Sequence, residues 1–391
     1  MNKLFCFWLW CAAAAAADDP RISPADILSA AGLFGGKVAP GEVIVLFPAN
    51  AGPAVLAGQQ FDPDGRVATQ IAGMRVLFDG VPAPIAYTVT GHACAVVPYE
   101  VSGKKDTQVV VEYRGARSEP VKLAVVESAP ALFTLDATGK GQAAMLNEMG
   151  CCNSRRNPAA PGEAAVLYAT GAGQTLPASV TGAVEVHNRD SDYPTPRAAV
   201  RVLVGGQPAQ ITFLGSAPHM VSGMVQINIR LPKNTPVGDA VPLKMTVGEA
   251  ISPDGVTMAV RPAARQILLV DAETASRAWL RKMLTDAGYS VFTARNGEEA
   301  AAAAKNHLLD MAVVSMAIPE EQRAQTVQSL RAAYPLIKVV ATTTIASAGT
   351  LRAADLMGAQ SLLQRPFTAR MVLPRLRELL RLHPVPYGAT R

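Results

Sequence analysis

The sequence predicts a multidomain chain in which two all-β sandwiches are followed by a doubly wound α/β domain. Three observations support this prediction: short segments recur in the first 260 residues, strand and helix patterns alternate from residue 265 onward, and the charge balance changes between the two parts. The 391 residues, 49% of them apolar, are enough for two or three domains with cores of their own. Residues 264–391 hold 16 Lys and Arg against 10 Asp and Glu, whereas the remainder has a net charge of −1.

Residues 1–17 have the pattern of a secretory signal peptide. Lys3 supplies the positive start, residues 4–17 form an apolar run, and Ala15-Ala16-Ala17 offers a cleavage site of small residues. The run is too short to cross a bilayer, which takes roughly 20 residues, and we expect no transmembrane span after it. A working signal predicts an exported protein, periplasmic or extracellular. The alternative is an unprocessed apolar tail on a cytoplasmic protein.

Three cysteines remain after such a signal: Cys94, Cys151 and Cys152. An odd number of cysteines does not make a disulfide framework, and their spacing is not that of a metal site. We expect surface or half-buried thiols, and their disulfide state stays open.

Two sequence patterns occur twice in the same order in the first part of the chain. Residues 40–47 recur as residues 161–168, and residues 74–83 recur as residues 200–209. Two matched pairs indicate two copies of one module, which we place at residues 18–126 and 127–261. The segments are short and rich in Val, Ile and Thr, and residues 225–231 alternate strictly between apolar and polar. Such segments, separated by Gly, Pro, Asn and Asp, are typical of antiparallel β-sandwiches.

Three phrases in this region carry a family resemblance. They are Ser-Ala-Pro-Ala-Leu-Phe-Thr-Leu-Asp at 128–136, Gly-Gln-Ala-Ala at 141–144 and Asn-Pro-Ala-Ala-Pro-Gly-Glu at 157–163. With them the region resembles the tandem immunoglobulin-like modules, akin to IPT/TIG domains, of exported bacterial proteins. The resemblance implies a structural or binding module at the cell envelope and no reaction.

The β-region has few residues that could bind a metal ion or catalyse a reaction. Residues 187–192 carry oxygen ligands at alternate positions, but they lack the glycine and the closing glutamate of a calcium loop, so a solvated loop is the other interpretation. His92 and His219 have no evident partner for a catalytic triad.

From residue 265 onward, apolar strand segments alternate with segments of helical periodicity, which predicts a parallel sheet with helices on both faces. We place a linker at residues 262–264, the α/β domain at 265–383 and a tail at 384–391. The expected strands are 267–270, 290–293, 311–315, 338–342 and 361–364, and the expected helices are 274–286, 298–307, 320–334, 347–357 and 368–382.

Residues 310–319 combine an acid, a buried strand, a polar residue at its end and a proline, and Gln364-Arg365-Pro366-Phe367 follows the last strand. With these motifs, residues 265–383 resemble the receiver domain of two-component response regulators, the CheY-like fold. The resemblance implies a flavodoxin-like strand order 2-1-3-4-5, with function at the carboxyl ends of the strands.

A receiver domain needs a carboxylate phosphoacceptor, further carboxylates for Mg²⁺, a hydroxyl and a lysine. In this sequence the corresponding residues are Ser315 for the phosphoacceptor, Asp271, Ala272 and Glu273 for the acidic pocket, Thr343 for the switch hydroxyl and Arg365 for the lysine.

These replacements predict a degenerate receiver that is not phosphorylated. The Ser315 hydroxyl cannot form an acyl phosphate, and Ala272 and Ser315 stand where carboxylates would bind Mg²⁺, so we expect no cofactor and no catalytic residue. Asp271 alone is a weak metal candidate, and we expect it to cap its loop or to pair with Arg365. Asp310 cannot substitute, because it lies roughly 16 Å along the strand from Ser315.

The last predicted helix carries arginines on one face, at positions 370, 375, 377 and 381. A solvated face is one interpretation. The other is docking, because in receivers the fourth helix, fifth strand and fifth helix form the usual partner face. We therefore expect a protein partner there and no nucleic acid, and a homodimer stays open.

The resulting hypothesis is a phosphorelay-type signal-transduction protein whose degenerate receiver acts as a protein-interaction module. The alternative is an exported structural or adhesion-type binding protein that retains the receiver fold as a scaffold. We do not expect an enzyme, because no nucleophile–base pair or metal cluster is evident in the sequence.

Overall fold

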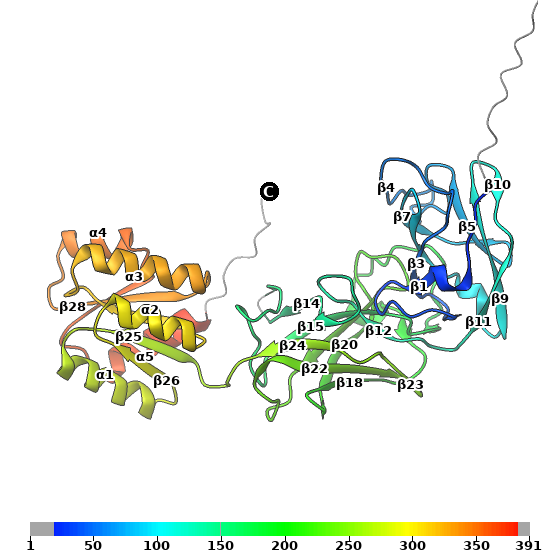
Figure 1. Ribbon diagram of the computed structural model, residues 1–391. Helices are drawn as coiled ribbons and strands as arrows, with labels where there is room; N and C mark the ends of the chain where they lie inside the picture. Colours follow the sequence, from blue (N-terminus) through cyan, green and yellow to red (C-terminus); the bar gives the residue numbers. More distant parts are fainter. Residues whose placement is uncertain (1–18, 149, 382–391) are drawn as a thin grey trace, which may run out of the picture.

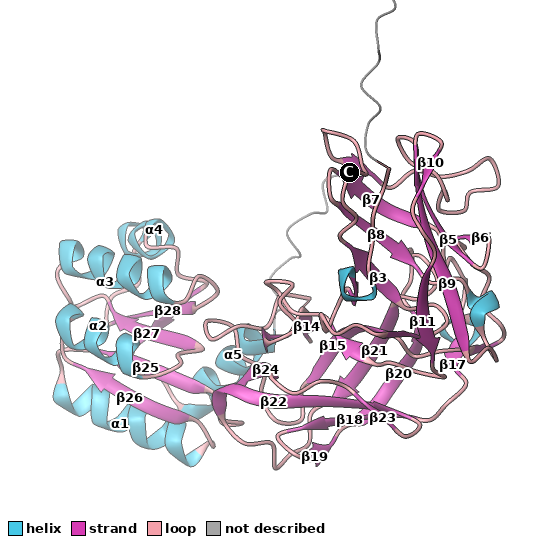
Figure 2. Cartoon of the chain, turned by 45° about the vertical axis from the view of Figure 1, so that its right-hand side comes forward, coloured by secondary structure: helices cyan, strands magenta, loops and turns pink. Residues whose placement is uncertain are grey.

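The computed structural model describes residues 19–148 and 150–381 and consists of a β-rich N-terminal region followed by an α/β domain. Figures 1 and 2 show two β-layered units and one α/β unit in chain order, with the second β unit between the other two. The expected signal peptide (residues 1–17) and the tail (residues 384–391) lie outside the described residues.

The first β unit packs two sheets face to face around buried side chains that include Ile44, Met74 and Phe78. One sheet runs in the order β1 (Ile27–Ser29), β3 (Val43–Leu46), β8 (His92–Val96), β7 (Ile85–Val89), β4 (Ala57–Gly58). The other runs in the order β2 (Lys37–Val38), β11 (Val121–Val125), β9 (Asp106–Tyr113), β5 (Met74–Phe78), β6 (Val81–Pro82), with β10 (Ala116–Arg117) beside β9. Short 3-10 turns lie at η1 (Pro24–Asp26) and η2 (Tyr99–Val101).

The second β unit has its own core, formed by side chains such as Leu167, Ile227 and Met245. One sheet runs in the order β12 (Ala131–Leu132), β15 (Ala164–Thr170), β21 (Val225–Arg230), β20 (Gln210–Ser216), with β14 (Met145–Asn147) on β15. The other runs in the order β13 (Gly141–Gln142), β24 (Val256–Val260), β22 (Gly238–Val247), β18 (Val200–Val204), β19 (Gln207–Pro208), with β23 (Ala250–Ile251) on β22. A ribbon of β16 (Thr175–Leu176) and β17 (Thr195–Pro196) and the turn η3 (Asp190–Asp192) lie outside these sheets.

Apart from β4 in the first unit and β14 in the second, the strand orders of the two β units match, and one equivalent hairpin has the same type of turn in both. The hairpin β5–β6 turns through Asp79 and Gly80, both at positive φ, and the hairpin β18–β19 turns through Gly205 and Gly206, also both at positive φ. Two central residues at positive φ define a type I′ turn, whose twist suits a tight hairpin and which favours Asp-Gly and Gly-Gly. Residues 225–230 of the alternating segment form β21, whose buried and less buried side chains alternate as the pattern predicts.

The α/β domain has a five-stranded parallel sheet in the order β26 (Ser290–Ala294), β25 (Gln266–Val270), β27 (Met311–Ser315), β28 (Lys338–Thr343), β29 (Ser361–Gln364). The helices are α1 (Thr274–Asp286), α2 (Gly297–Asn306), α3 (Glu320–Ala333), α4 (Ala348–Leu356) and α5 (Ala369–Arg381). This is the predicted order 2-1-3-4-5. β25 and β27 are buried along their whole length because apolar clusters cover both faces of the sheet.

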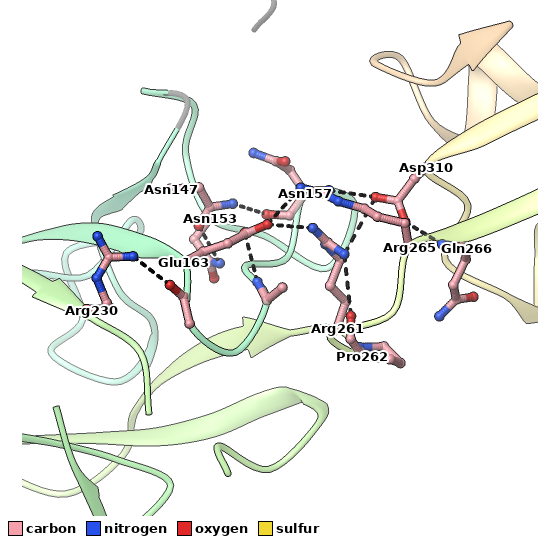
Figure 3. A network of polar contacts seen from close by, with 12 residues as sticks. Asn147, Asn153, Asn157, Glu163, Arg230, Arg261, Pro262, Arg265, Gln266 and Asp310 are labelled. Atoms are coloured by element: carbon pink, nitrogen blue, oxygen red, sulfur yellow. Dashed lines mark hydrogen bonds and ion pairs between the residues drawn. The ribbon is translucent and has the colours of Figure 1, made fainter. Parts of the chain in front are cut away.

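The two junctions between the units differ in character. The β units share an apolar cluster that joins Val45 and Val96 of the first to Val221 of the second, and Val43 N–H donates a 2.8 Å hydrogen bond to Thr170 Oγ1. The α/β domain meets the second β unit through arginine and carboxylate side chains around residues 261–265 (Figure 3). The first junction is therefore mainly a packing contact, and the second is mainly an electrostatic one.

Candidate functional site

The carboxyl ends of four parallel strands bring the predicted site residues to one edge of the α/β sheet. Asp271 follows β25, Ser315 ends β27, Thr343 ends β28 and Arg365 follows β29. Because neighbouring parallel strands end on the same side, these side chains converge although they are up to 94 positions apart in the chain.

Arg365 forms ion pairs with two carboxylates of the acidic pocket. Its guanidinium donates one hydrogen bond to Asp271 and another, of 2.7 Å, to Glu273. The Asp271 side chain is 3% exposed and that of Arg365 is 14% exposed, so this pair lies at the buried end of the pocket. Pairing with Arg365 is one of the two roles expected for Asp271.

The loop after β25 is fixed by hydrogen bonds as well as by this ion pair. The second oxygen of Asp271 accepts a 3.1 Å hydrogen bond from the Glu273 N–H, and Arg277 of α1 donates a 2.6 Å hydrogen bond to the Asp271 carbonyl. Ala272, which lies between the two acids, is exposed and offers no ligand atom on its side chain. Both carboxylates thus accept hydrogen bonds from Arg365, and Ala272 between them adds no negative charge.

Ser315 is 2% exposed and has a local hydrogen-bond partner. Its Oγ accepts a 3.3 Å hydrogen bond from the Ala317 N–H, a contact that turns the chain after β27. Thr343 is also engaged locally, because its hydroxyl donates to the Ile345 carbonyl at 2.9 Å and accepts from the Ile345 N–H at 3.1 Å. Both hydroxyls therefore stabilise loops at the ends of their strands.

A second arginine, Arg323 of α3, lies at this site and was not found from the sequence. Its side chain is largely buried and donates hydrogen bonds to the carbonyls of Met316 (2.9 Å) and Ile318 (2.5 Å). Together with Ser315 and Arg365 it lines a cavity of about 480 Å³. The predicted helix contained Arg323, but periodicity alone does not show that a charged side chain folds back over the loop before the helix.

Two carboxylates and one guanidinium meet at the centre of this site. Asp271 and Glu273 face the guanidinium of Arg365, and only Arg365 Nε is a buried nitrogen without a hydrogen-bond partner among the described arginines. A guanidinium has a fixed planar shape and cannot give up its proton, so Arg365 holds both acids through separate nitrogens without offering a lysine's compact charge. The arrangement can hold loops together, but it offers no carboxylate nucleophile at residue 315.

The helices α4 and α5 expose large apolar side chains as well as basic ones. Leu351 and Leu356 of α4 are 56% and 78% exposed, and Met371 of α5 is 56% exposed. Arg370 and Arg377 of α5 are also exposed. α5 begins at Ala369 and continues through Pro374.

A second polar cluster lies at the opposite end of the strands and joins the α/β domain to the second β unit (Figure 3). Arg261 and Arg265 both donate to Glu163, at 2.6 and 3.0 Å, and Arg265 also donates to Asp310 at 2.9 Å. Asp310 further accepts a 2.7 Å hydrogen bond from the Gln266 N–H. The sequence showed that Asp310 is far from the phosphoacceptor position but did not show this role.

The remaining candidates do not add a reactive site. Cys94, Cys151 and Cys152 are free thiols, and burial raises the pKa of the Cys94 thiol to about 12. His187 contacts Glu185 at 2.7 Å, whereas Asp190–Asp192 form an exposed turn. Within residues 19–148 and 150–381, no three His, Cys, Asp or Glu side chains are grouped so that they could hold a metal ion. Over the same residues, no helix combines the length and the hydropathy needed to cross a membrane.

Comparison with known proteins assigns the C-terminal part of the chain. Residues 267–377 match the response regulator receiver domain. Response regulator MprA of Mycobacterium sp. (strain KMS) is 32% identical over 116 residues, which is 30% of this chain and 50% of that protein. The chain therefore spans about half the length of the curated relatives it matches.

Solved structures of receiver proteins are similar to 30% of this chain. The chemotaxis protein CheY4 of Vibrio cholerae is 28% identical, with a TM-score of 0.29, over 30% of this chain and 99% of that one. A CheY-like receiver domain protein of Methanospirillum hungatei JF-1 is 24% identical, with a TM-score of 0.28, over 30% of this chain and 94% of that one.

Proposed function

We propose that this chain, whose C-terminal part is a response regulator receiver domain, is a two-component-type signalling protein in which the receiver works as a protein-interaction module without being phosphorylated. The observation that carries the proposal is the ion pairing of Arg365 with Asp271 and Glu273, beside a serine at the phosphoacceptor position.

Phosphorylation of a receiver requires a carboxylate that attacks the phosphoryl donor and acids that are free to bind Mg²⁺. Here residue 315 is a serine, and Asp271 and Glu273 are both held by Arg365. To bind Mg²⁺, Asp271 would have to give up a nearly buried charge pair, while Ala272 supplies no replacement ligand. These features favour a receiver that keeps one conformation by internal contacts and whose output depends on binding.

The proposed partner face is the α4–β29–α5 surface. It combines the exposed apolar side chains of Leu351, Leu356 and Met371 with the exposed Arg370 and Arg377. Exposed apolar side chains and arginine are both characteristic of protein interfaces. The surface therefore fits a protein partner with a complementary apolar and acidic patch.

We also infer that the two β units are copies of one immunoglobulin-like module. Their matching strand orders and their type I′ hairpins at the same place support this inference. In the signalling protein, the modules would supply further contacts and hold the receiver at one end of the chain.

The direct test is labelling of the full chain with acetyl phosphate and Mg²⁺. We expect no hydroxylamine-sensitive acyl phosphate on the wild-type protein. The triple variant Ala272→Asp, Ser315→Asp, Arg365→Lys restores both carboxylates and the lysine, and it serves as the positive control. Stoichiometric labelling of the wild type would refute the phosphorylation-independent receiver.

Partner binding is tested separately, with a photo-crosslinking amino acid placed at residue 356 and, as a control, at residue 135. Both Leu356 and Leu135 are exposed, but Leu135 lies in the second β unit. We expect a defined protein adduct at residue 356 that does not change when acetyl phosphate is withheld. Adducts that require acetyl phosphate, or that are the same at both positions, would contradict the proposal.

The alternative function is an exported structural or adhesion-type protein. It is favoured by the apolar cluster that the two β units share and by the signal-peptide pattern of the first 17 residues. A fusion of those residues to a reporter active only outside the cytoplasm separates the alternatives. An inactive reporter would exclude the adhesion role.

A further inference from the structure

A cavity of about 720 Å³ lies between the second β unit and the receiver domain, at the amino ends of the receiver strands. We propose that this cavity binds a small amphipathic anion, with an apolar body and a single carboxylate, sulfonate or similar head group. Cavities of this size at domain junctions, lined by apolar side chains and a few polar groups, are typical of small-molecule sites.

The receiver supplies most of the apolar lining. Leu308 and Leu309 come from the loop before β27, and Leu336 and Ile337 come from the loop before β28. Pro158 lies opposite, on the second β unit. An apolar ligand body placed between these side chains would remove surface from water on both domains and so favour binding.

The charged side chains around the cavity favour an anion. Arg261 and Arg265 are already paired with Glu163 and Asp310, so these four charges neutralise one another.

Two other cations of the lining, Arg156 and Lys338, make no ion pair with any residue in the described ranges. They come from different domains, and Glu148 is the one further acid that lines the cavity. The lining thus has one net positive charge, carried by side chains that are free to contact a ligand.

The wall on the side of the β unit is held by a network of asparagines (Figure 3). Asn153 donates to Asn147 at 2.8 Å, Asn147 donates to the Asn157 carbonyl at 2.6 Å, and Asn157 donates to the Cys152 carbonyl at 3.0 Å. These side-chain bonds fix the segment that carries Arg156 before any ligand arrives. A wall that is fixed in advance lowers the entropy cost of binding.

The test compares two fluorescent probes on the full chain. 8-Anilinonaphthalene-1-sulfonate has an aromatic body and one sulfonate, and N-phenyl-1-naphthylamine is the same body without the charge. We expect saturable binding of the sulfonate with one site per chain.

In the variant Arg156→Met, Lys338→Met, which keeps the apolar stems, binding of the sulfonate should weaken roughly tenfold or more, as for lost charge-assisted hydrogen bonds. Binding of the neutral probe should not change. The control variant Arg155→Met, Lys305→Met removes two exposed cations that do not line the cavity and should bind both probes as the wild type does.

A second readout is independent of these substitutions. Cys151 and Cys152 line the cavity, so saturating sulfonate should slow their alkylation by iodoacetamide, measured by peptide mass spectrometry. Unchanged alkylation, or unchanged affinity of the Arg156→Met, Lys338→Met variant for the sulfonate, would overturn the proposal. Because the cavity lies at the end of the strands opposite Ser315, these results do not depend on whether the receiver is phosphorylated.

Discussion

Glu42 and Glu163 occupy equivalent turns in the two β units, but only Glu163 faces cationic side chains. Each ends a Pro-Gly-Glu sequence and accepts a 2.9 Å hydrogen bond from the backbone N–H three residues earlier. Glu42 is completely buried, and its other oxygen has no hydrogen-bond partner in the described chain. Glu163 faces Arg261 and Arg265. Burial raises the pKa of Glu42 from its ordinary value of 4.5 to about 8.

This burial makes the stability of the first β unit depend on pH. The unfolded chain releases the Glu42 proton near pH 4.5, whereas the folded chain keeps it up to about pH 8. The folded state therefore binds more protons between these values, and its free energy of unfolding falls as the pH rises through this range.

Replacing Glu42 by Gln removes this pH dependence. We expect Glu42→Gln to exceed the wild type in stability by on the order of a few kcal/mol at pH 8.5, with little or no advantage at pH 4. Urea unfolding followed by circular dichroism at both pH values measures this difference. Glu163→Gln is the matched control and should not stabilise, because it removes the partner of two arginines. An equal effect of Glu42→Gln at both pH values would show that folding does not raise the pKa of Glu42.

Glu163 should fix the pose of the receiver relative to the second β unit. Glu163→Gln leaves Arg261, whose side chain is 7% exposed, without its closest carboxylate. Losing this charged hydrogen bond should weaken the junction by about 1–3 kcal/mol. We expect a larger radius of gyration in small-angle X-ray scattering and faster proteolysis at residues 262–264.

The control for the junction is Glu299→Gln, which breaks the exposed Arg295–Glu299 pair within the receiver. An exposed pair of this kind contributes little, so scattering and proteolysis should match those of the wild type. Equal behaviour of Glu163→Gln and Glu299→Gln would mean that the junction does not depend on Glu163.

Arg365 should be needed for the stability of the receiver because it neutralises Asp271. In Arg365→Ala the Asp271 carboxylate, whose side chain is 3% exposed, keeps its hydrogen bond from the Glu273 N–H but loses its charge partner. Breaking one side of a buried pair costs about 3–5 kcal/mol. Thermal unfolding can be followed by the fluorescence of Trp279, which packs on Phe367 at a centroid distance of 5.7 Å.

The double variant Arg365→Ala, Asp271→Asn distinguishes an orphaned charge from lost packing. It removes the carboxylate that Arg365→Ala leaves unpaired, so it should recover most of the lost stability. A double variant as unstable as Arg365→Ala would point to the packing of the arginine side chain instead.

Most of the receiver fold could be predicted from the sequence because its signals are local. The helix predicted at residues 274–286 has those bounds in the structure, since apolar periodicity and Gly288 define its length and its end. The convergence of Asp271 and Arg365 also followed from the sequence, because a parallel sheet brings strand ends together.

The junction between the domains could not be predicted in the same way. Glu163, Arg261 and Asp310 come from three separate parts of the chain, and no spacing rule joins them. The only local signal was the recurrence of the Pro-Gly-Glu turn, which marked Glu163 as the counterpart of Glu42 but did not indicate what each glutamate faces. The environment of a repeated residue depends on the neighbouring domain, which lies outside the repeat.

Arg323 should hold the loop that follows Ser315. Its guanidinium donates to the carbonyls of Met316 and Ile318, which a shorter or uncharged side chain cannot replace. In Arg323→Met these carbonyls lose a charged donor, so the receiver should lose about 1.5–3 kcal/mol of stability and residues 316–318 should exchange their amide hydrogens faster. Hydrogen–deuterium exchange mass spectrometry measures the second effect. Arg352→Met, at an exposed arginine of α4, is the matched control and should leave exchange in this loop unchanged. Equal exchange in the two variants would mean that the loop is held by its backbone bonds alone and that Arg323 only covers it.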